Sequence, residues 1–318
     1  MQSIAVFIPI YNGESYLRST LQSILDQTYE HFTVYCVNDS STDSSLHIIN
    51  EFSKIDSRII VFTKEQGGST AKSWNFVLPK IKEDFVFYMS QDDLLSPDVF
   101  EKMIERQAET DSDCILPDMV LYHVDEKDNE IICGLNGDQS VILTGIQAFQ
   151  KSLQWQIHGF ALRKTDLYHD EHFFEDAYDT DDYMSRKLFY KCKKVAFSTG
   201  SFFYRQDNPG AITKTFGIKN YYSLSTSLRI YSLILQSDQL KRERKNWFSY
   251  MIKTYTRASR NFRINKGITT THEKKEVEKF LKQTRHRLLR LLFSAGNLSA
   301  KAYWLKEIYF SKIYKIKL

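Results

Sequence analysis

Short apolar runs alternate with helically spaced segments through the first hundred residues, and this alternation constrains the fold most strongly. Apolar residues three and four apart indicate helices, whereas short continuous apolar runs indicate buried strands. The runs cover residues 4–9, 32–37, 58–62 and 85–89, and the segments between them cover 14–25, 41–52 and 69–78. This rhythm predicts βαβ units with right-handed crossovers, and therefore an α/β fold with a mostly parallel sheet flanked by helices.

Polar residues follow each of the four predicted strands. In a mostly parallel sheet, ligands bind beyond the carboxyl ends of the strands. Four stretches meet there: residues 9–13, residues 38–43, the stretch after Phe62, and residues 90–93. We therefore expect the functional site along this edge of the sheet.

The chain changes character near residue 220. All five prolines and ten of the twelve glycines lie at or before Gly217, so the last third is predicted to be helical. The net charge of +4 hides a second change, because residues 1–236 hold 22 basic and 33 acidic side chains, whereas residues 237–318 hold 21 basic and 6 acidic. We predict an α/β domain over 1–220 and a basic, aromatic-rich helical region over 221–318.

The N-terminal residues and the cysteines bear on the compartment. The opening MQSIAVFIPI lacks a basic n-region and a small-residue cleavage site, and no run approaches eighteen apolar residues. Neither a signal peptide nor a transmembrane helix is therefore expected. The four cysteines form no C-x-x-C pair, which argues against a zinc site or a disulfide framework. A cytoplasmic protein is the simplest expectation.

Two adjacent carboxylates, Asp92 and Asp93, follow the fourth predicted strand. Mg²⁺ and Mn²⁺ prefer oxygen ligands and are commonly held by one or two carboxylates together with substrate phosphates. The same residues could instead cap a turn before the helix predicted over 97–108. The residues alone leave both interpretations open.

The turns after the second and third strands suit a nucleotide. Asp39 could accept a hydrogen bond from a base N–H or a ribose hydroxyl, or could serve only as a turn residue. The pair Gly67-Gly68 precedes a helix whose N-terminus could hold a phosphate, and Lys72 could reach that phosphate or remain solvated. This segment matches neither the P-loop nor the dinucleotide fingerprint, which weighs against P-loop hydrolases and common dehydrogenases.

The order and spacing of these motifs resemble the opening of family-2 glycosyltransferases. These enzymes have the GT-A fold, a Rossmann-like, mostly parallel sheet flanked by helices. The resemblance is carried by PIYN at 9–12, SILDQT at 23–28, VNDSSTD at 37–43, Gly68, Trp74-Asn75 and QDD at 91–93. It covers about residues 3–105, is looser over about 150–210, and implies that residues 1–220 form a GT-A catalytic domain.

The resemblance implies roles for individual residues around a nucleotide-sugar donor. Pro9, Tyr11 and Glu14 match positions that line the nucleotide pocket, and Asp39 matches the residue that contacts the base. The nucleotide-sugar site expected from the resemblance and from the turns above also includes Lys72, Gln91, Asp92 and Arg205.

The metal assignment depends on Asp92. This residue matches the last Asp of the family's D-x-D motif, which holds Mn²⁺ or Mg²⁺ against the diphosphate. The first Asp of that motif is Ser90 here, which weakens the expected ribose contact. Metal binding is then expected at Asp92, helped by Asp93, and metal-independent action stays open.

An acidic cluster at 178–183 contains the candidate base. Asp182 resembles the second residue of the family's E-D motif, which acts as the base, and Asp181 replaces the Glu. In an inverting transfer, such a carboxylate removes the proton of the acceptor hydroxyl as the anomeric carbon is attacked from the far side. The alternative is that these carboxylates only stabilise a helix N-terminus.

Three further residues complete the expected site. Trp155 and His158 stand where such enzymes often place acceptor contacts, with the tryptophan stacking on a sugar ring; a core tryptophan and a buried histidine are the alternative. Arg205 resembles part of the family's Y-R element and is expected to contact phosphate or to order a lid over the donor. The Q-x-x-R-W motif of processive synthases is absent, so a single addition is expected.

The region beyond residue 221 combines aromatic side chains with Lys and Arg, as at 241–247 and 302–305. This combination suits the headgroup region of an anionic membrane. A helical subdomain with a solvated basic face is the alternative. No recognised nucleic-acid motif appears, so a nucleic-acid partner is not expected.

These expectations combine into a metal-dependent, inverting glycosyltransferase. It would move one sugar from a UDP-linked donor to a hydroxyl of a lipid-linked glycan, in bacterial capsule or O-antigen assembly at the inner face of the plasma membrane. One alternative is a non-catalytic nucleotide-sugar binding protein, which Ser90 would favour. The other is a nucleotidylyltransferase, which normally needs a Gly-rich basic loop that residues 9–14 do not provide.

Overall fold

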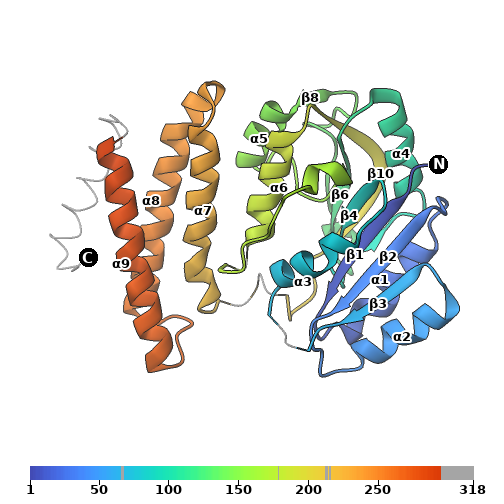
Figure 1. Ribbon diagram of the computed structural model, residues 1–318, viewed down its shortest axis with the longest axis horizontal. Helices are drawn as coiled ribbons and strands as arrows, with labels where there is room; N and C mark the ends of the chain where they lie inside the picture. Colours follow the sequence, from blue (N-terminus) through green and yellow to red (C-terminus); the bar gives the residue numbers. More distant parts are fainter. Residues whose placement is uncertain (66–67, 178, 212–213, 215, 295–318) are drawn as a thin grey trace. The chain divides into compact units, whose positions relative to one another are not determined.

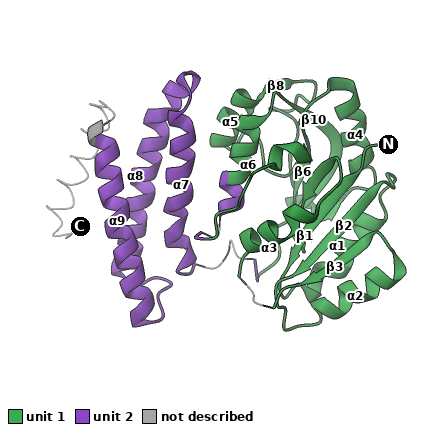
Figure 2. Cartoon of the chain, in the orientation of Figure 1, with its two compact units in different colours: residues 1–175, 184–209 green, residues 176–183, 210–318 purple. Residues whose placement is uncertain are grey.

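The computed structural model describes residues 1–65, 68–177, 179–211, 214 and 216–294, which form two compact units (Figures 1 and 2). Unit 1 comprises residues 1–175 and 184–209, and unit 2 comprises residues 176–183 and 210–318. The segment expected at 302–305 lies outside the described residues. The short acidic segment 176–183 therefore groups with the C-terminal helices.

Four parallel strands form one half of the sheet in unit 1, in the order β3-β2-β1-β4. They are β1 (Ile4–Ile10), β2 (Phe32–Asn38), β3 (Ile59–Thr63) and β4 (Phe85–Tyr88). All four were expected from the apolar runs of the sequence, and their ends differ from the expected ends by one residue at most. The predicted α/β fold with a mostly parallel sheet is confirmed.

The sheet continues beyond β4 through strands that the repeating pattern did not include. In order they are β9 (Leu162–Lys164), β6 (Cys114–Tyr122), β10 (Lys194–Arg205) and β5 (Leu94–Leu95), with β7 (Glu130–Ile132) beside β6 and β8 (Ile142–Thr144) beside β10. β6 and β10 are parallel to each other, whereas β9 runs antiparallel to both β4 and β6. The antiparallel β9 brings the segment that precedes it past the carboxyl end of β4.

Helices cover both faces of the sheet (Figure 1). One face packs on α1 (Glu14–Leu25), α2 (Ser45–Ile55) and α4 (Val99–Thr110), and the other packs on α3 (Thr70–Val77) and on the later turns of α6 (Thr180–Lys191). Alternate residues of β1 belong to the two cores, with Ile4, Val6 and Ile8 on one side and Ala5 and Phe7 on the other. A strand buried on both faces needs a continuous apolar run, which explains the pattern in the sequence.

The second predicted helix begins later than expected, at Ser45 instead of residue 41. The intervening residues form a turn that bonds to the loop after β1, with Thr42 donating its N–H to Asn12 Oδ1 at 2.8 Å. Ser45 Oγ in turn accepts the N–H of Gly13 at 2.8 Å. The Ser41 hydroxyl, which could have capped a helix at residue 41, instead accepts the N–H of Asn12 in the loop after β1 at 3.1 Å.

Unit 2 contains α7 (Lys219–Leu235), α8 (Lys241–Arg263) and α9 (Thr271–Ser294), so the expected helical region is confirmed as far as residue 294. Its aromatic side chains form much of its core: Tyr221, Tyr231, Trp247 and Phe248 are buried. Trp247 Nε1 donates to the carbonyl of Ser227 at 2.9 Å. Trp247, the aromatic residue of the 241–247 segment that was expected at a membrane surface, is therefore occupied in packing the helices together.

The remaining elements are short. α5 (Gly145–Leu153) follows β8, and single 3₁₀ turns cover Leu78–Lys80, Glu126–Asp128, Thr165–Tyr168 and Asp238–Leu240. Within the described residues, no helix is both long enough and apolar enough to cross a membrane.

Candidate functional site

The carboxyl ends of β1 and β4 are joined by a side-chain amide. Gln91 Oε1 accepts the N–H of Tyr11 at 2.8 Å, and Gln91 Nε2 donates to the carbonyl of Tyr11 at 2.9 Å. A methyl group at Gly13 would lie 2.4 Å from Gln91 Oε1, so a larger residue there would displace this amide. Gln91 therefore fixes the loop after β1, and Tyr11 lies above it with 57% of its surface exposed.

Glu14 and Asp43 bind the loops after β1 and β2 to each other. Glu14 Oε2 accepts the N–H of Ser44 at 2.9 Å, and Asp43 Oδ2 accepts the N–H of Glu14 at 3.0 Å. Burial raises the pKa of the Asp43 carboxyl, but hydrogen bonds from Ser45 and Glu14 outweigh it, so the pKa is lowered overall. The Glu14 carboxylate, which was expected at the nucleotide, is used here to join the loops after β1 and β2.

Asp39 lies in a polar cradle at the end of β2. Lys64, directly after β3, places its Nζ 2.6 Å from Asp39 Oδ1, and the N–H of Gly68 lies 3.0 Å from Asp39 Oδ2. The side chains of Asp39 and Lys64 are only 9% and 11% exposed, so this is a buried ion pair. The side chain of Lys72 folds back over Gly68. A methyl group at Gly68 would lie only 2.4 Å from Lys72 Cδ. The structure thus brings Asp39 and Lys72 to the same turn.

Asp92 and Asp93 have different surroundings although they are adjacent. Asp92 is half-buried, and its Oδ2 accepts a hydrogen bond from Asn208 Nδ2 at 2.6 Å. Asp93 is 1% exposed, and its Oδ1 accepts the N–H of Arg205 at 3.0 Å. Burial, with the nearby Asp92 carboxylate, raises the pKa of Asp93 well above its usual range. Asp92 is therefore the member of the pair that is suited to bind a cation.

The side chain of Arg205 connects the end of β10 to this acidic turn. Its Nε donates to the carbonyl of Asp92 at 2.7 Å. Its guanidinium carbon lies 4.6 Å from the ring centre of Tyr16 and 4.9 Å from that of Tyr122. Two aromatic faces and a carbonyl hold the cation next to Asp92, where an anionic group of a ligand would meet it.

A divalent cation fits this edge only with help from a ligand. Within the described residues, no group of three His, Cys, Asp or Glu side chains could hold a metal ion. Mg²⁺ and Mn²⁺ in phosphate-binding sites need only one or two carboxylates, because phosphate oxygens and water supply the other ligands. Asp92, with one oxygen bonded to Asn208, meets that lesser requirement.

The comparison with protein families agrees with this geometry. The family model described as glycosyl transferase family 2 matches residues 5–207. The chain belongs to glycosyl transferase family 2. The matched residues include every strand of the sheet, the turns that carry Asp39 and Asp92, and Arg205 at the end of β10.

Relatives of this chain are bacterial glycosyltransferases. Glycosyltransferase GlyG of Streptococcus pneumoniae is 26% identical over 222 residues, which are 67% of this chain and 73% of GlyG. The putative teichuronic acid biosynthesis glycosyltransferase TuaG of Bacillus subtilis is 33% identical over 106 residues, or 33% of this chain and 42% of TuaG. A second pneumococcal relative, glycosyltransferase GlyA, is 27% identical over 70% of this chain, and the match spans only 33% of GlyA.

A solved structure supports the fold. The crystal structure of S. aureus TarS 1-349 in complex with UDP-GlcNAc matches with a TM-score of 0.65 at 17% identity. The match covers 89% of this chain and 81% of that one. The predicted family and the predicted GT-A-like fold with a helical C-terminal region are thereby confirmed.

The two candidates for the base, Asp181 and Asp182, lie in the first turn of α6 and belong to unit 2. The segment just before them is bonded to α7, because Thr226 Oγ1 donates to Asp179 Oδ1 at 2.7 Å and Arg229 pairs with Asp176 at 2.7 Å. The predicted base is therefore held by the helical unit, although the nucleotide-site candidates all lie in unit 1.

The two acceptor candidates have opposite environments. Trp155 is 71% exposed, whereas His158 is 9% exposed and its Nε2 lies 2.9 Å from the carbonyl oxygen of Pro117. Because a carbonyl only accepts, Nε2 must carry the proton. Burial lowers the pKa of His158 to about 4. The structure thus places His158 among the buried polar groups and leaves Trp155 at the surface.

Three functional candidates were missed from the sequence. Lys64 directly follows the third strand, so the rule that ligands bind at carboxyl ends could have found it. Asn208 lies three residues after Arg205 in a segment that was already of interest. Tyr122 gave no signal, because its contact with Arg205 depends on the pairing of β6 with β10.

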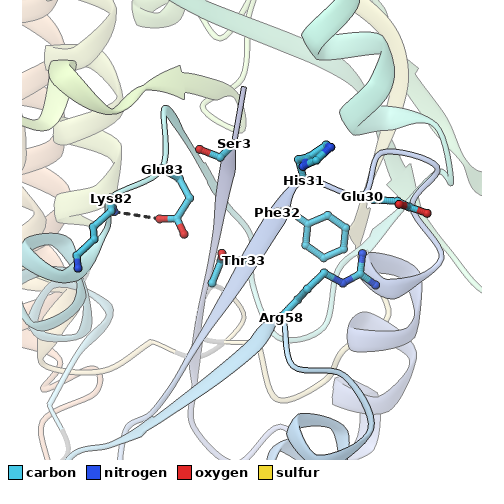
Figure 3. A pocket seen from close by; sticks show the side chains of 8 residues that line it. All are labelled: Ser3, Glu30, His31, Phe32, Thr33, Arg58, Lys82 and Glu83. Carbon is cyan, nitrogen blue, oxygen red and sulfur yellow. Dashed lines mark hydrogen bonds between the residues drawn. The ribbon is translucent and has the colours of Figure 1, made fainter. Parts of the chain in front are cut away.

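A separate hollow of about 430 Å³ lies at the opposite edge of the sheet (Figure 3). Its lining comes from residues at the amino ends of the strands, including Ser3 before β1, Phe32 at the start of β2, Arg58 before β3 and Glu83 before β4. The family motifs end at the carboxyl edge instead. We therefore place the candidate site at the carboxyl edge and not in this hollow.

The buried, neutral His158 predicts a specific pH dependence of stability. Its pKa is about 4 in the folded chain and about 6.5 when unfolded, so below pH 6.5 the unfolded state binds the extra proton. This destabilises the fold by about 2 kcal/mol at pH 5, and the loss continues towards pH 4. His158→Gln should lose less stability than the wild type between pH 7.5 and 5, measured by urea unfolding.

The exposed His169, whose side chain is 82% exposed, provides the matched control. His169→Gln should keep the pH dependence of the wild type. Equal pH dependence in His158→Gln and the wild type would contradict the assignment.

Proposed function

We propose that this chain transfers a single sugar from a UDP-sugar to a hydroxyl of a glycan, with inversion at the anomeric carbon. One observation carries the proposal: the Asp39 cradle after β2 and the pair Asp92–Arg205 after β4 and β10 lie along the same carboxyl edge of the sheet in a family-2 chain. One cluster suits a nucleoside, and the other suits a diphosphate.

The Asp39 cradle suits the base or ribose of the nucleotide. Each carboxylate oxygen has two lone-pair directions, and the hydrogen bonds from Lys64 and Gly68 take one on each oxygen. Asp39 therefore keeps capacity to accept an N–H of uracil or a hydroxyl. The TarS structure bound to UDP-GlcNAc supports UDP as the nucleotide.

Asp92 and Arg205 suit the departing diphosphate. Asp92 would hold Mn²⁺ or Mg²⁺, which would neutralise charge on the leaving UDP. Arg205 supplies a fixed positive charge beside the same turn, held by two tyrosine rings and the Asp92 carbonyl. Positive charge held in place before the reaction stabilises a developing anion without reorganisation.

Asp182 is the proposed base, and Asp181 is the lesser candidate. A carboxylate in the first turn of a helix is kept ionised by the helix dipole, which suits it to accept a proton. In the proposed step, the acceptor oxygen bonds to the anomeric carbon, the bond from that carbon to UDP breaks, and the hydroxyl proton passes to Asp182.

The acceptor is proposed to be a lipid-linked bacterial surface glycan of the capsule or O-antigen type. TuaG, named for teichuronic acid biosynthesis, supports a surface polysaccharide. The exposed side of α8 supports association with the anionic inner face of the plasma membrane. α8 carries seven exposed cations and a single acidic residue, Glu243; the cations are Lys241, Arg242, Lys245, Lys253, Arg257, Arg260 and Arg263.

A UDP-release assay tests the donor half of the proposal. Wild-type chain with Mn²⁺ should release UDP from at least one UDP-sugar, and Mn²⁺ should strengthen UDP binding. Asp92→Asn should remove that strengthening, measured by calorimetry with and without Mn²⁺, because one of the metal's few protein ligands is lost. The control Asp111→Asn changes a carboxylate that is 82% exposed on another turn and should behave as wild type.

Two outcomes would count against the proposed donor and metal site. UDP affinity that is the same with and without Mn²⁺ in the wild type would remove the metal assignment. Nucleotide binding without turnover of any UDP-sugar would favour the non-catalytic binding protein instead.

Asp182→Asn tests the base. The amide cannot accept the proton, so the transfer rate should fall at least about 100-fold while UDP-sugar affinity stays within about twofold. Asp181→Asn should lower the transfer rate less than Asp182→Asn does. A transfer rate for Asp182→Asn within a few-fold of the wild type would refute this role.

Charge removal on α8 tests membrane association. Each cation near an anionic bilayer contributes about 1 kcal/mol, so the double change Arg257→Gln with Arg260→Gln should weaken vesicle binding about 30-fold at low salt. Sedimentation with phosphatidylglycerol vesicles measures the vesicle binding of each variant. The control pair Lys274→Gln with Lys275→Gln lies on α9 between Glu273 and Glu276 and should have a smaller effect. Equal losses for the two pairs would refute α8 as the contact surface.

A further inference from the structure

The side-chain amide of Asn75, in α3, binds a segment that is distant in the sequence. Its Oδ1 accepts the N–H of Phe173 at 2.8 Å, and its Nδ2 donates to the carbonyl of Phe173, 98 residues away, at 2.8 Å. Nδ2 also donates to Glu175 Oε1 at 2.9 Å. Because an amide carries two N–H groups and one acceptor oxygen, it can make all three bonds at once. One side chain therefore fixes the path of residues 173–175.

The preceding residue, Trp74, holds the same segment by aromatic stacking. Its ring is nearly parallel to the ring of Phe173, with ring centres 4.8 Å apart and an angle of 6° between the planes. Trp74 is 2% exposed, so this contact belongs to the core of unit 1, where stacked aromatic pairs stabilise packing. Two consecutive residues of α3, one apolar and one polar, thus hold the residues that lead into the acidic segment 176–183.

The chain that follows the acidic segment is held by the same core. The candidate base Asp182 lies in the first turn of α6, and Met184 follows on that helix. The side chain of Met184 is buried and belongs to the hydrophobic core that contains Trp74 and Phe173. The segment 176–183 therefore leaves unit 1 and returns to it close to residues that this one core holds.

The N-terminal half of α3 is tied to the Asp39 cradle. Lys64, whose Nζ pairs with Asp39, also donates to Ser73 Oγ at 3.3 Å, and Ser73 directly precedes Trp74. α3 begins two residues after Gly68, whose N–H binds the other oxygen of Asp39. One short helix is thus bonded both to the proposed nucleotide site and to the segment before the proposed base.

We propose that Asn75 is a positioning residue for the transfer, because it ties the segment before Asp182 to the helix that adjoins the nucleotide cradle. The inference rests on the proposed transferase function and on Asp182 as its base. A base must lie within hydrogen-bond reach of the acceptor hydroxyl. A displacement of about 1 Å can lower a rate about 100-fold, so the path of this segment bears directly on the turnover number.

Asn75→Ala tests this role through the turnover number per nucleotide site. Calorimetry with UDP counts the sites, and UDP release is measured from UDP-glucose, UDP-galactose and UDP-N-acetylglucosamine with the methyl β-glycosides of the same sugars as acceptors. The turnover number per site should fall about 10- to 100-fold, while UDP affinity stays within about twofold of the wild type. An amide that only stabilises the fold would lower the melting temperature and the number of sites, but not the turnover number per site.

A double-mutant cycle tests whether Asn75 acts through the base. In the Asp182→Asn background, Asn75→Ala should change the residual turnover number by less than about twofold, because no base remains to be misplaced. A general defect would lower the turnover number by the same factor in both backgrounds.

The control Gln107→Ala removes another side-chain amide of unit 1. Gln107 is 4% exposed, and its Oε1 accepts a hydrogen bond at 2.9 Å from Gln2, which precedes β1 at the amino edge of the sheet. This variant should lose stability and keep the turnover number per site of the wild type.

Asn75→Asp keeps the size of the side chain and serves if Asn75→Ala fails to fold. Its carboxylate cannot donate to the carbonyl of Phe173, and it lies beside the carboxylate of Glu175, so the turnover number per site should fall at least about tenfold. Adding Glu175→Gln supplies an N–H donor to the new carboxylate and should restore the turnover number at least about threefold.

Three results would overturn the positioning role. They are a wild-type turnover number per site in Asn75→Ala or Asn75→Asp, a UDP affinity that falls together with the turnover number, and losses that multiply with that of Asp182→Asn. If the wild type turns over none of the three UDP-sugars, the proposed transferase function fails instead. If Asp182→Asn turns over as the wild type does, the base assignment fails, and the role of Asn75 fails with it.

Discussion

Parallel pairing of β1 with β2 on one side and with β4 on the other determines where the chemistry of this chain can occur. Both neighbours point their carboxyl ends the same way as β1, so Asp39 and Asp92 arrive at one edge although 53 residues of sequence separate them. The Gln91 amide extends the pairing beyond the last strand residues, because it bonds both main-chain groups of Tyr11. The loops at this edge are therefore braced by the same kind of bond that builds the sheet.

The sequence could predict the features that depend on local pattern. The helix over Glu14–Leu25 was expected with both of its ends, because its apolar spacing is regular and the turns on either side are polar. The family assignment depended on short motifs at strand ends, which keep their spacing in the linear sequence. The features that depend on distant parts of the chain could not be predicted in this way. Lys64 could be noticed after the third strand, but its ion pair with Asp39 and the contacts of Arg205 with Tyr16 and Tyr122 became visible only with the fold.

Burial was the second quantity that the sequence could not supply. Asp92 and Asp93 cannot be told apart from the sequence alone. Asp92 is half-buried, whereas Asp93 is buried against β10 and its pKa is raised. Trp155 and His158 were paired as acceptor candidates, and the structure separates them into an exposed ring and a buried, neutral imidazole. Local rules and overall fold agree over most of a natural protein, and the places where they conflict tend to be functional.

Residues 176–183 are attached to the helical unit, so the C-terminal helices also hold the segment that contains the candidate base. Thr226 of α7 binds Asp179 across 47 residues of sequence, and the candidate base Asp182 follows in the first turn of α6. On the proposed assignment of Asp182 as the base, a substitution in α7 that removes the bond to Asp179 would reach the proton-transfer step, although α7 lies outside the donor edge. The C-terminal helices then set the position of the proposed base as well as the stability of their own core.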